Sequence, residues 1–189
     1  MPRLFTGLRI PTEIAQDLAL LRGGLAGARW IEQEDYHVTL RFIGDVGLPL
    51  AREIHCELAR IQREPLAIAL NEIDSFGGTK PRALVIRVRA TPDLIALQAQ
   101  HDRAILRAGG SRDTRKFSPH VTLARLRNTS PSQIAHFLGA RTGPRTWNFT
   151  ANEFELFSAR DSVGGGPYLT EAIYPLRASD PQARPANSQ

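Results

Sequence analysis

The tetrapeptide His-Val-Thr-Leu occurs twice in the sequence, beginning at His37 and again at His120. Each copy carries a hydroxyl two residues after its imidazole, at Thr39 and at Thr122. Because the unperturbed pKa of histidine is about 6.5, one ring of such a pair can be neutral while the other is protonated near neutral pH. The neutral ring can then accept a proton from an attacking oxygen, and the charged ring can protonate a leaving oxygen.

The two threonines suit the same chemistry, because neutral hydroxyls can donate hydrogen bonds to the non-bridging oxygens of a phosphate. Two acid–base histidines and two neutral donors together predict a phosphodiesterase site that needs neither metal nor cofactor. The alternative is that the repeat is a coincidence, so the positions of the two copies in the fold decide between the two interpretations.

Both copies have the composition of β-strands. Side chains alternate between the two faces of a strand, so each histidine shares a face with the threonine that follows it. The valine and leucine of each copy point to the opposite face. One face of each strand therefore suits a hydrophobic core, and the other offers an imidazole and a hydroxyl to a cleft.

The segments around the motifs alternate between strand and helix patterns. Strands are expected at 3–10, 28–33, 36–44, 66–76, 83–90, 118–126, 146–159 and 167–176. Helices are expected from 12 to the glycine pair at 23–24 and over 48–62, 91–110 and 130–140. Thr12, Thr91 and Ser130 are the expected N-caps, because their hydroxyls can accept from backbone N–H groups of the first turn.

Each half of the chain thus repeats one order: a strand, a helix, a strand with the motif, then more helix and strand. This repetition predicts an α+β fold with two pseudo-symmetric lobes of antiparallel sheet and outer helices around a central cleft that carries both motifs. We expect residues 1–177 to form this single bilobal domain. The segment 178–189 has little apolar content and is expected to be a disordered tail.

The composition excludes several classes of protein. The chain has 189 residues, of which 42% are hydrophobic, and its single cysteine rules out a disulfide framework or a cysteine-rich zinc site. It has no run of about 18 apolar residues for a membrane span and no signal-peptide core at its start. We therefore expect a cytoplasmic monomer with no membrane partner.

The charge is basic, with a formal net charge of +5 and 24 lysines and arginines, of which only Lys80 and Lys116 are lysines. The planar guanidinium of arginine suits phosphate recognition. A genome rich in G and C is the alternative reason for this bias. The charge therefore permits an RNA or nucleotide ligand without establishing one.

The remaining histidines and the acids near the first motif predict no second site. His55, His101 and His136 lie in helical segments without a threonine two residues later, so structural roles are expected for them. Asp35 and Asp45 flank the first motif, but no equivalent acids flank the second, which argues against a dinuclear metal centre.

The sequence around the motifs resembles the two-histidine phosphoesterase superfamily, and within it the RNA 2′,3′-cyclic phosphodiesterases, also called 2′-5′ RNA ligases. The similar segments are RLFTGLRIP, RWIEQEDYHVTLRFIGDV, RKFSPHVTLARLR and FELFSARDSVGGGPYLTEAIYPL, which together cover most of residues 3–177. Four segments agree in order and spacing, which makes the resemblance specific.

The resemblance implies roles for individual residues. His37 matches the family's proton donor to the departing 3′ oxygen, and His120 matches the proton acceptor that activates water. Thr39 and Thr122 match the residues that hold phosphate oxygens, and Arg125 matches an arginine implicated in phosphate binding. The implied product is a 2′-phosphate, formed from RNA or nucleotide ends without metal or cofactor.

Strand alternation conflicts with the role implied for Arg125. Regular alternation turns Arg125 away from the cleft, whereas it places Arg41 on the face of the first histidine, so either a bulge re-aims Arg125 or the strand ends before it. Arg41 is therefore a second candidate for phosphate binding. Phe42 and Tyr168 are candidates for stacking on a base, with packing in the interior as the alternative.

Three other functions compete with hydrolysis. The first is ligation of 2′-5′ RNA junctions, the reverse of the same reaction, which dilute water disfavours. The second is a non-catalytic RNA-binding module, which would tolerate lysine or arginine at the histidine positions. The third is a metal-dependent hydrolase, which a chelator would inhibit.

Overall fold

A computed structural model describes residues 3–141, 145–159 and 166–177 of the chain. The first half contains β1 (Arg3–Arg9), α1 (Thr12–Ala19), β2 (Ala28–Trp30), the 3₁₀ helix η1 (Gln33–Asp35), β3 (His37–Asp45), α2 (Leu48–Ala59) and β4 (Leu66–Phe76). The second half contains β5 (Ala83–Val88), α3 (Pro92–Arg107), β6 (His120–Leu126), α4 (Pro131–Gly139), β7 (Trp147–Ala151), β8 (Glu153–Ala159) and β9 (Tyr168–Pro175). The tail expected at 178–189 lies outside the described residues.

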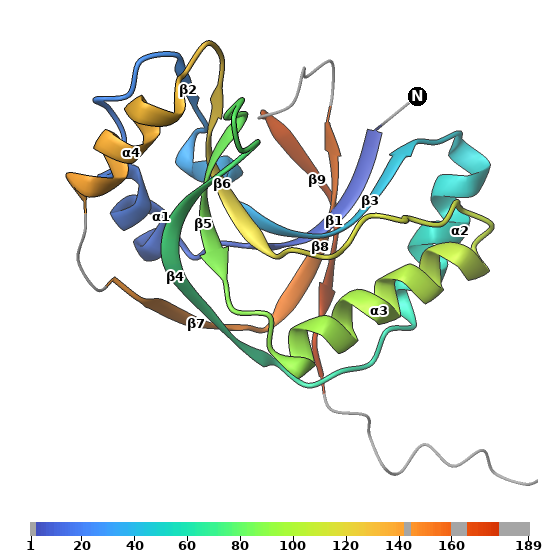
Figure 1. Ribbon diagram of the computed structural model, residues 1–189. Helices are drawn as coiled ribbons and strands as arrows, with labels where there is room; N and C mark the ends of the chain where they lie inside the picture. The colour runs from blue at the N-terminus through green and yellow to red at the C-terminus, as the bar shows by residue number, and fades with distance from the viewer. Residues whose placement is uncertain (1–2, 142–144, 160–165, 178–189) are drawn as a thin grey trace, which may run out of the picture.

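The strands form one antiparallel sheet in the order β7-β4-β5-β6-β3-β1-β8-β9, with β2 paired to β6 beside β3. The two motif strands, β3 and β6, are neighbours at the middle of this order (Figure 1). They join only through the register pair Val38 and Val121, whereas every neighbouring pair along the sheet is longer. The sheet therefore divides into two lobes at the point where the two motifs meet.

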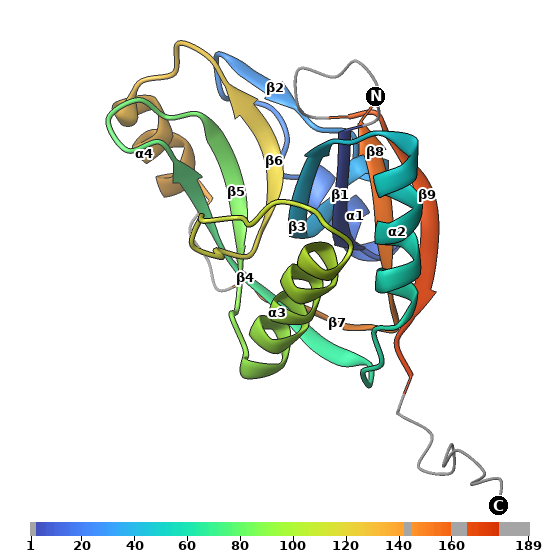
Figure 2. The ribbon, with the colours of Figure 1, turned by 90° about the vertical axis from the view of Figure 1, so that its right-hand side faces the viewer.

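Helices α2 and α3 lie together, whereas α1 and α4 stand apart from each other in the second view (Figures 1 and 2). α2 and α3 pack against each other, and α3 also contacts β3 and β4. α1 and α4 lie at the other side of the molecule, where Arg141 after α4 donates to the carbonyl of Gly23 after α1 at 3.1 Å. The α+β architecture with two antiparallel lobes, predicted from the repeated order of elements, is confirmed.

The apolar faces of the two motif strands form part of the core. Val38, Val121 and Leu123 are fully buried and Leu40 is nearly so. Burying four such side chains contributes several kcal/mol, at about 25 cal/mol per Å² of apolar surface removed from water. This burial fixes which face of each strand remains for polar groups.

Two of the three expected N-caps are present. The Thr91 hydroxyl accepts from the backbone N–H of Leu94 at 3.2 Å, and Ser130 forms a reciprocal capping box with Gln133. The expected cap at Thr12 is wrong, because Pro11 occupies the N-cap position and its carbonyl accepts from the Ala15 N–H at 2.9 Å. The Pro11 backbone is extended, and its fixed φ suits the position just before the first helical residue, Thr12.

Other expected boundaries are also shorter in the structure. α1 ends at Ala19 instead of reaching the glycine pair, and the strand expected over 28–33 is limited to β2, followed by η1. The segment expected as strand over 146–159 divides at Asn152 into β7 and β8, which pair with different lobes.

Candidate active site

The four motif side chains line one cleft between the lobes, with a volume of about 320 Å³. The lining residues are Phe5, Ile31, Asp35, His37, Thr39, Phe42, Phe76, Arg115, His120, Thr122, Arg125 and Tyr168. This volume is within the range of small-molecule sites, which begin at about 300 Å³. The cleft is therefore large enough to enclose a phosphate with part of its nucleoside.

The register between the motif strands relates the two motifs by a local two-fold arrangement. Because Val38 pairs with Val121 in an antiparallel ladder, the next positions outward place His37 opposite Thr122 and Thr39 opposite His120. These four residues lie on the face opposite the buried valines. Each imidazole therefore has the hydroxyl of the other lobe as its cross-strand neighbour.

Both imidazoles are held by the same local contact. His37 Nδ1 lies 2.7 Å from the Asp35 carbonyl oxygen, and His120 Nδ1 lies 2.7 Å from the Ser118 carbonyl oxygen. A carbonyl oxygen can only accept, so Nδ1 donates in both rings and the lone pair of the neutral ring is on Nε2. The backbone thereby sets the same tautomer twice and leaves Nε2 of each ring available for proton transfer.

Aromatic rings pack against both imidazoles. The His37 ring lies 4.8 Å from Phe5 and meets the edge of Tyr168 at 5.1 Å and 90°. The His120 ring meets Phe76 edge-on at 4.7 Å. These contacts restrict ring rotation and exclude water from one side of each imidazole.

Burial among these groups lowers the pKa of both histidines. Desolvation is the main cause for His37, and its pKa falls to about 4. The positive charges of Arg9 and Arg125 and the second imidazole act in the same direction, and the Asp35 carbonyl opposes them. Desolvation also lowers the pKa of His120. Both rings are therefore neutral near pH 7 in the free protein.

A β-bulge in each motif strand decides which later side chains reach the cleft. In β3, Gly7 pairs with Thr39 and Thr6 with Arg41, so Leu40 has no register partner in β1. In β6, Val85 pairs with Thr122 and Leu84 with Ala124, so Leu123 is likewise skipped. A bulge reverses the alternation of faces beyond it. It occurs at the third residue after each histidine, one more feature that the two lobes share.

The bulges place Arg125 in the cleft and remove Arg41 from it. Arg125 follows the bulge in β6 and lines the cleft, which is the first of the two outcomes considered for it. The expected position of Arg41 is wrong: its side chain is only 4% exposed, and it forms ion pairs with Asp102 at 2.6 Å and with Asp113 at 3.5 Å. Regular alternation failed here because it ignores the extra residue at Leu40.

The two aromatic candidates also reach the cleft. Phe42 occupies the position in β3 that Arg125 occupies in β6, five residues after the histidine, and it is 41% exposed. Tyr168 is fixed by its backbone N–H, which donates to Asp35 Oδ1 at 2.9 Å. Their stacking on a base stays a prediction, as do the roles of the other site residues.

Five lining residues were not among the candidates: Phe5, Ile31, Asp35, Phe76 and Arg115. Asp35 was considered only as a metal ligand, although its place two residues before the histidine could have suggested its carbonyl contact. The sequence signals for Phe76 and Arg115 as site residues were weaker. Phe76 is an aromatic residue before a glycine pair, and Arg115 lies five residues before the second motif. Phe5 and Ile31 read as ordinary core residues.

The other three histidines lie away from the cleft. His101 is fully buried on the inner face of α3, His55 contacts the Tyr174 hydroxyl at 2.7 Å, and His136 is exposed on α4. Among the residues that the structure describes, no group of three or more His, Cys, Asp or Glu side chains is placed to hold a metal ion. In the same residues, no helix is both long and apolar enough to span a membrane.

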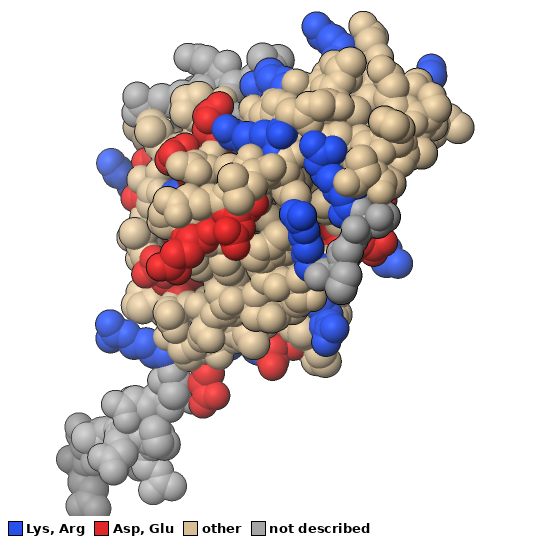
Figure 3. All heavy atoms as spheres, turned by 90° about the vertical axis from the view of Figure 1, so that its left-hand side faces the viewer, with Lys and Arg blue, Asp and Glu red and all other residues tan. Residues whose placement is uncertain are grey.

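The charges on one face of the molecule are mixed. Figure 3 shows Lys and Arg side chains spread over this face beside a band of Asp and Glu side chains. The net charge of +5 is therefore not concentrated into a uniformly basic surface on the side drawn. The cleft itself is lined by two cationic side chains, Arg115 and Arg125.

The chain is similar to a known protein family. The family described as LigT like Phosphoesterase matches the chain twice, over residues 8–87 and 88–168. Each match contains one of the two motifs and one of the two bulges. The tandem match thus repeats once for each motif, although β4 and most of β5 fall in the first match and lie in the half of the sheet that carries the second motif.

Curated relatives share the sequence over much of its length. The chain is 34% identical over 130 residues to the RNA 2′,3′-cyclic phosphodiesterase of Bacillus subtilis, covering 66% of this chain and 71% of that protein. It is 35% identical over 116 residues to the protein of the same name from Aeropyrum pernix, covering 58% and 66%. A third relative of that name, from Escherichia coli, is 24% identical over 88% of this chain and 92% of its own.

Solved structures share the fold. E. coli LigT complexed with 3′-AMP superposes with a TM-score of 0.76 at 23% identity, covering 93% of this chain and 99% of that chain. A crystal structure described as a phosphoesterase gives a TM-score of 0.77 at 22% identity, covering 93% and 98%. The likeness thus extends over most of the chain and concerns the fold.

Proposed function

The chain belongs to the family of LigT-like phosphoesterases, and on this premise we propose that it hydrolyses 2′,3′-cyclic phosphates at RNA or nucleotide ends to 2′-phosphomonoesters. The observation that carries the proposal is the matched pair of imidazoles. Two rings with the same tautomer, set by the same backbone contact, line one cleft with two hydroxyls and an arginine. This set of groups can supply the acid, the base and the charge stabilisation for an in-line displacement at phosphorus.

The proposed reaction uses one ring on each side of the phosphorus atom. His120 Nε2 accepts a proton from water as the water oxygen forms its bond to phosphorus. The bond from phosphorus to the 3′ oxygen breaks, and that oxygen takes a proton from His37 Nε2. The 2′ ester bond remains, so the product carries a 2′-phosphate, and solvent returns the two rings to their starting states.

The threonines and Arg125 stabilise the charge on phosphorus in this reaction. The hydroxyls of Thr39 and Thr122 donate to non-bridging oxygens, and the guanidinium of Arg125 supplies the positive charge near both rings. The assignment of acid and base to particular rings follows the resemblance of the two motifs to the family pattern.

Substrate binding favours the protonated form of His37, which is the form that can act as an acid. In the free protein desolvation holds the His37 pKa at about 4, so the ring is neutral at pH 7. A bound phosphodiester places a negative charge beside the ring, which raises the pKa and favours the imidazolium. Protonation of His37 is therefore coupled to binding of an anionic ligand.

The test is an assay on a 2′,3′-cyclic nucleotide in excess EDTA, with the 2′- and 3′-phosphate products resolved by chromatography. We expect 2′-phosphate, and a loss of at least about 10²-fold in rate for His37→Ala and for His120→Ala, the low end for a lost acid or base. His136→Ala, on the exposed face of α4, is the matched control. Full activity in either cleft variant, or a requirement for metal, would contradict the proposal.

A further inference from the structure

A second depression, here called the side pocket, opens directly beside the cleft and has a volume of about 250 Å³. It shares five lining residues with the cleft: Thr39, Phe42, Phe76, Arg115 and His120. A ligand held between the two imidazoles can therefore extend into the side pocket without crossing a wall of protein. The use of this space is not explained by the reaction at phosphorus.

The outer wall of the side pocket is the connection between α3 and β6, residues 108–119. It contributes Arg115, Lys116 and Phe117, followed by Ser118. Arg115 and Lys116 are exposed, and Phe117 is partly buried. Cations that contact phosphates and aromatic rings that contact bases are the two elements by which proteins bind single-stranded nucleic acid.

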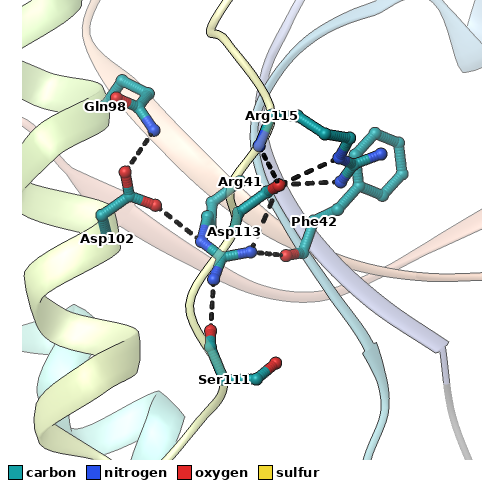
Figure 4. A network of polar contacts seen from close by, with 7 residues as sticks. All are labelled: Arg41, Phe42, Gln98, Asp102, Ser111, Asp113 and Arg115. Carbon is teal, nitrogen blue, oxygen red and sulfur yellow. Dashed lines mark hydrogen bonds and ion pairs between the residues drawn. The ribbon is translucent and has the colours of Figure 1, made fainter.

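Arg115 is held in place before any ligand binds. Its Nε and Nη2 atoms donate to the two carboxylate oxygens of Asp113 at 2.9 and 2.7 Å, and its guanidinium lies over the Phe42 ring at 5.0 Å. Figure 4 shows that the third guanidinium nitrogen points away from Asp113. Because the side chain is already ordered, contact with a phosphate loses little further conformational entropy.

Arg41 fixes the connection that carries Arg115. It is buried, it pairs with Asp102 on α3 and with Asp113, and it also donates to the carbonyls of Phe42 and Ser111 (Figure 4). One side chain thus ties β3 to α3 and to the connection between α3 and β6. Two arginines and two aspartates balance in charge, so Lys116 supplies the uncompensated positive charge of the side pocket and Arg115 offers the outward edge of its guanidinium as a hydrogen-bond donor.

We propose that the side pocket binds the nucleotide on the 5′ side of the terminal 2′,3′-cyclic nucleotide, with Arg115 and Lys116 contacting the connecting phosphodiester. This inference rests on the proposed function. A nucleotide with a 2′,3′-cyclic phosphate is the last of its strand, so the strand can continue from the cleft only through the 5′ oxygen. The protein is then selective for RNA ends over cyclic mononucleotides.

The experiment compares kcat/KM for a 2′,3′-cyclic mononucleotide with kcat/KM for a dinucleotide that ends in the same cyclic nucleotide. We expect the wild-type ratio to favour the dinucleotide. In Arg115→Ala and in Lys116→Ala we expect that ratio to fall roughly 3- to 10-fold, mainly through KM, as for a lost contact to phosphate at an exposed position. Arg115→Lys should give an intermediate ratio, because it keeps the charge but loses the bidentate contact with Asp113.

The matched control is Arg3→Ala, which removes another exposed arginine paired with an aspartate, outside both depressions. Its ratio should equal that of the wild type. A wild-type ratio near one, an unchanged ratio in both side-pocket variants, or an equal fall in Arg3→Ala would overturn the inference.

If the wild type hydrolyses neither substrate, the proposed function fails and the side pocket is tested by binding alone. Titration would then compare a nucleoside 2′-phosphate with a dinucleotide that ends in a 2′-phosphate. Tighter binding of the dinucleotide that is lost in Arg115→Ala and Lys116→Ala would support the side pocket. Equal affinity for the two ligands would overturn it.

Discussion

Val38 and Val121 face each other as the register pair that joins the two lobes, and all four motif side chains are one residue away from this pair. Both valines are fully buried. The distance between the two imidazoles therefore depends on the packing of two apolar side chains that touch no substrate.

Val38→Ala should reduce both stability and activity. The cavity should lower the free energy of unfolding by roughly 1–3 kcal/mol, and movement of β3 relative to β6 should lower kcat more than KM. Urea unfolding and steady-state kinetics measure the two effects. Val46→Ala, a buried valine between β3 and α2 and eight residues from Val38, is the control and should lower stability without a comparable fall in kcat.

The dependence of activity on pH should reflect the lowered histidine pKa values. In the free protein the pKa of His37 is about 4 and that of His120 is below 6.5, so kcat/KM, which reports the free enzyme, should be largest between about pH 4 and 6.5. The two limbs of the pH profile of kcat should lie at higher pH, because the bound phosphate raises the pKa values of both histidines. NMR titration of the ring protons, with and without a nucleoside 2′-phosphate, measures each pKa. A His37 pKa near 6.5 in the free protein would contradict this account.

His101 should make the protein less stable in acid. It is fully buried against Phe154, neither ring nitrogen has a hydrogen-bond partner among the described residues, and burial lowers its pKa to about 3. The unfolded chain, with a pKa near 6.5, binds more protons between these values, so this contribution is complete above pH 6.5 and decreases as the pH falls toward 3. Each pH unit within this window costs up to about 1.4 kcal/mol.

Thermal unfolding of His101→Phe between pH 4 and 7 tests this prediction. The variant should show a flatter dependence of Tm on pH than the wild type, whereas His136→Gln on the exposed face of α4 should keep the wild-type slope. Equal slopes in all three proteins would assign the acid sensitivity to other groups.

Gly7→Ala should disturb the first motif from the neighbouring strand. A Cβ atom at Gly7 would lie 2.8 Å from the Val38 carbonyl oxygen and 3.5 Å from the His37 ring, so β1 and β3 must separate. We expect a loss of roughly 1–3 kcal/mol in stability and a fall in kcat. Gly139→Ala, where a Cβ meets nothing within 4 Å, is the control and should be neutral or slightly stabilising.

Arg41→Met should act on the side pocket rather than on the reaction at phosphorus. Removing the guanidinium leaves Asp102 and Asp113 without their shared cation. Because both carboxylates are partly solvated, we expect a loss of roughly 1–3 kcal/mol in stability. The ratio of kcat/KM for dinucleotide over mononucleotide should fall as in Arg115→Ala. An unchanged ratio would show that Arg115 keeps its position without Arg41.

The sequence predicted the features that depend on local pattern. β4 has the expected bounds, α3 and α4 begin at the expected caps, and the apolar faces of both motif strands are buried. The presence of both motifs in one cleft follows from a repeat that places matching strands at the middle of one sheet. For these features, the order of residue types along the chain is enough to predict the structure.

The faces of Arg41 and Phe42 could not be predicted in this way. They depend on the bulge at Leu40, which arises where the register of β3 with β1 shifts, and a single strand read alone carries no record of its partner's register. The cap at Thr12 failed for a local reason, because Pro11 takes the N-cap position and Thr12 is already the first helical residue. The faces of Arg41 and Phe42 depend on the pairing of distant segments, which the alternation within one strand does not show.

The equivalent bulges leave the site with a direction that its backbone lacks. The two lobes present the same tetrapeptide and the same kink, yet the residue after the kink is Phe42 in one and Arg125 in the other. The cleft also differs around the two imidazoles, with Tyr168 against His37 and Phe76 against His120. We expect the unlike pair of Phe42 and Arg125, one aromatic and one cationic, to help orient the ligand and so to favour one ring as proton donor and the other as acceptor.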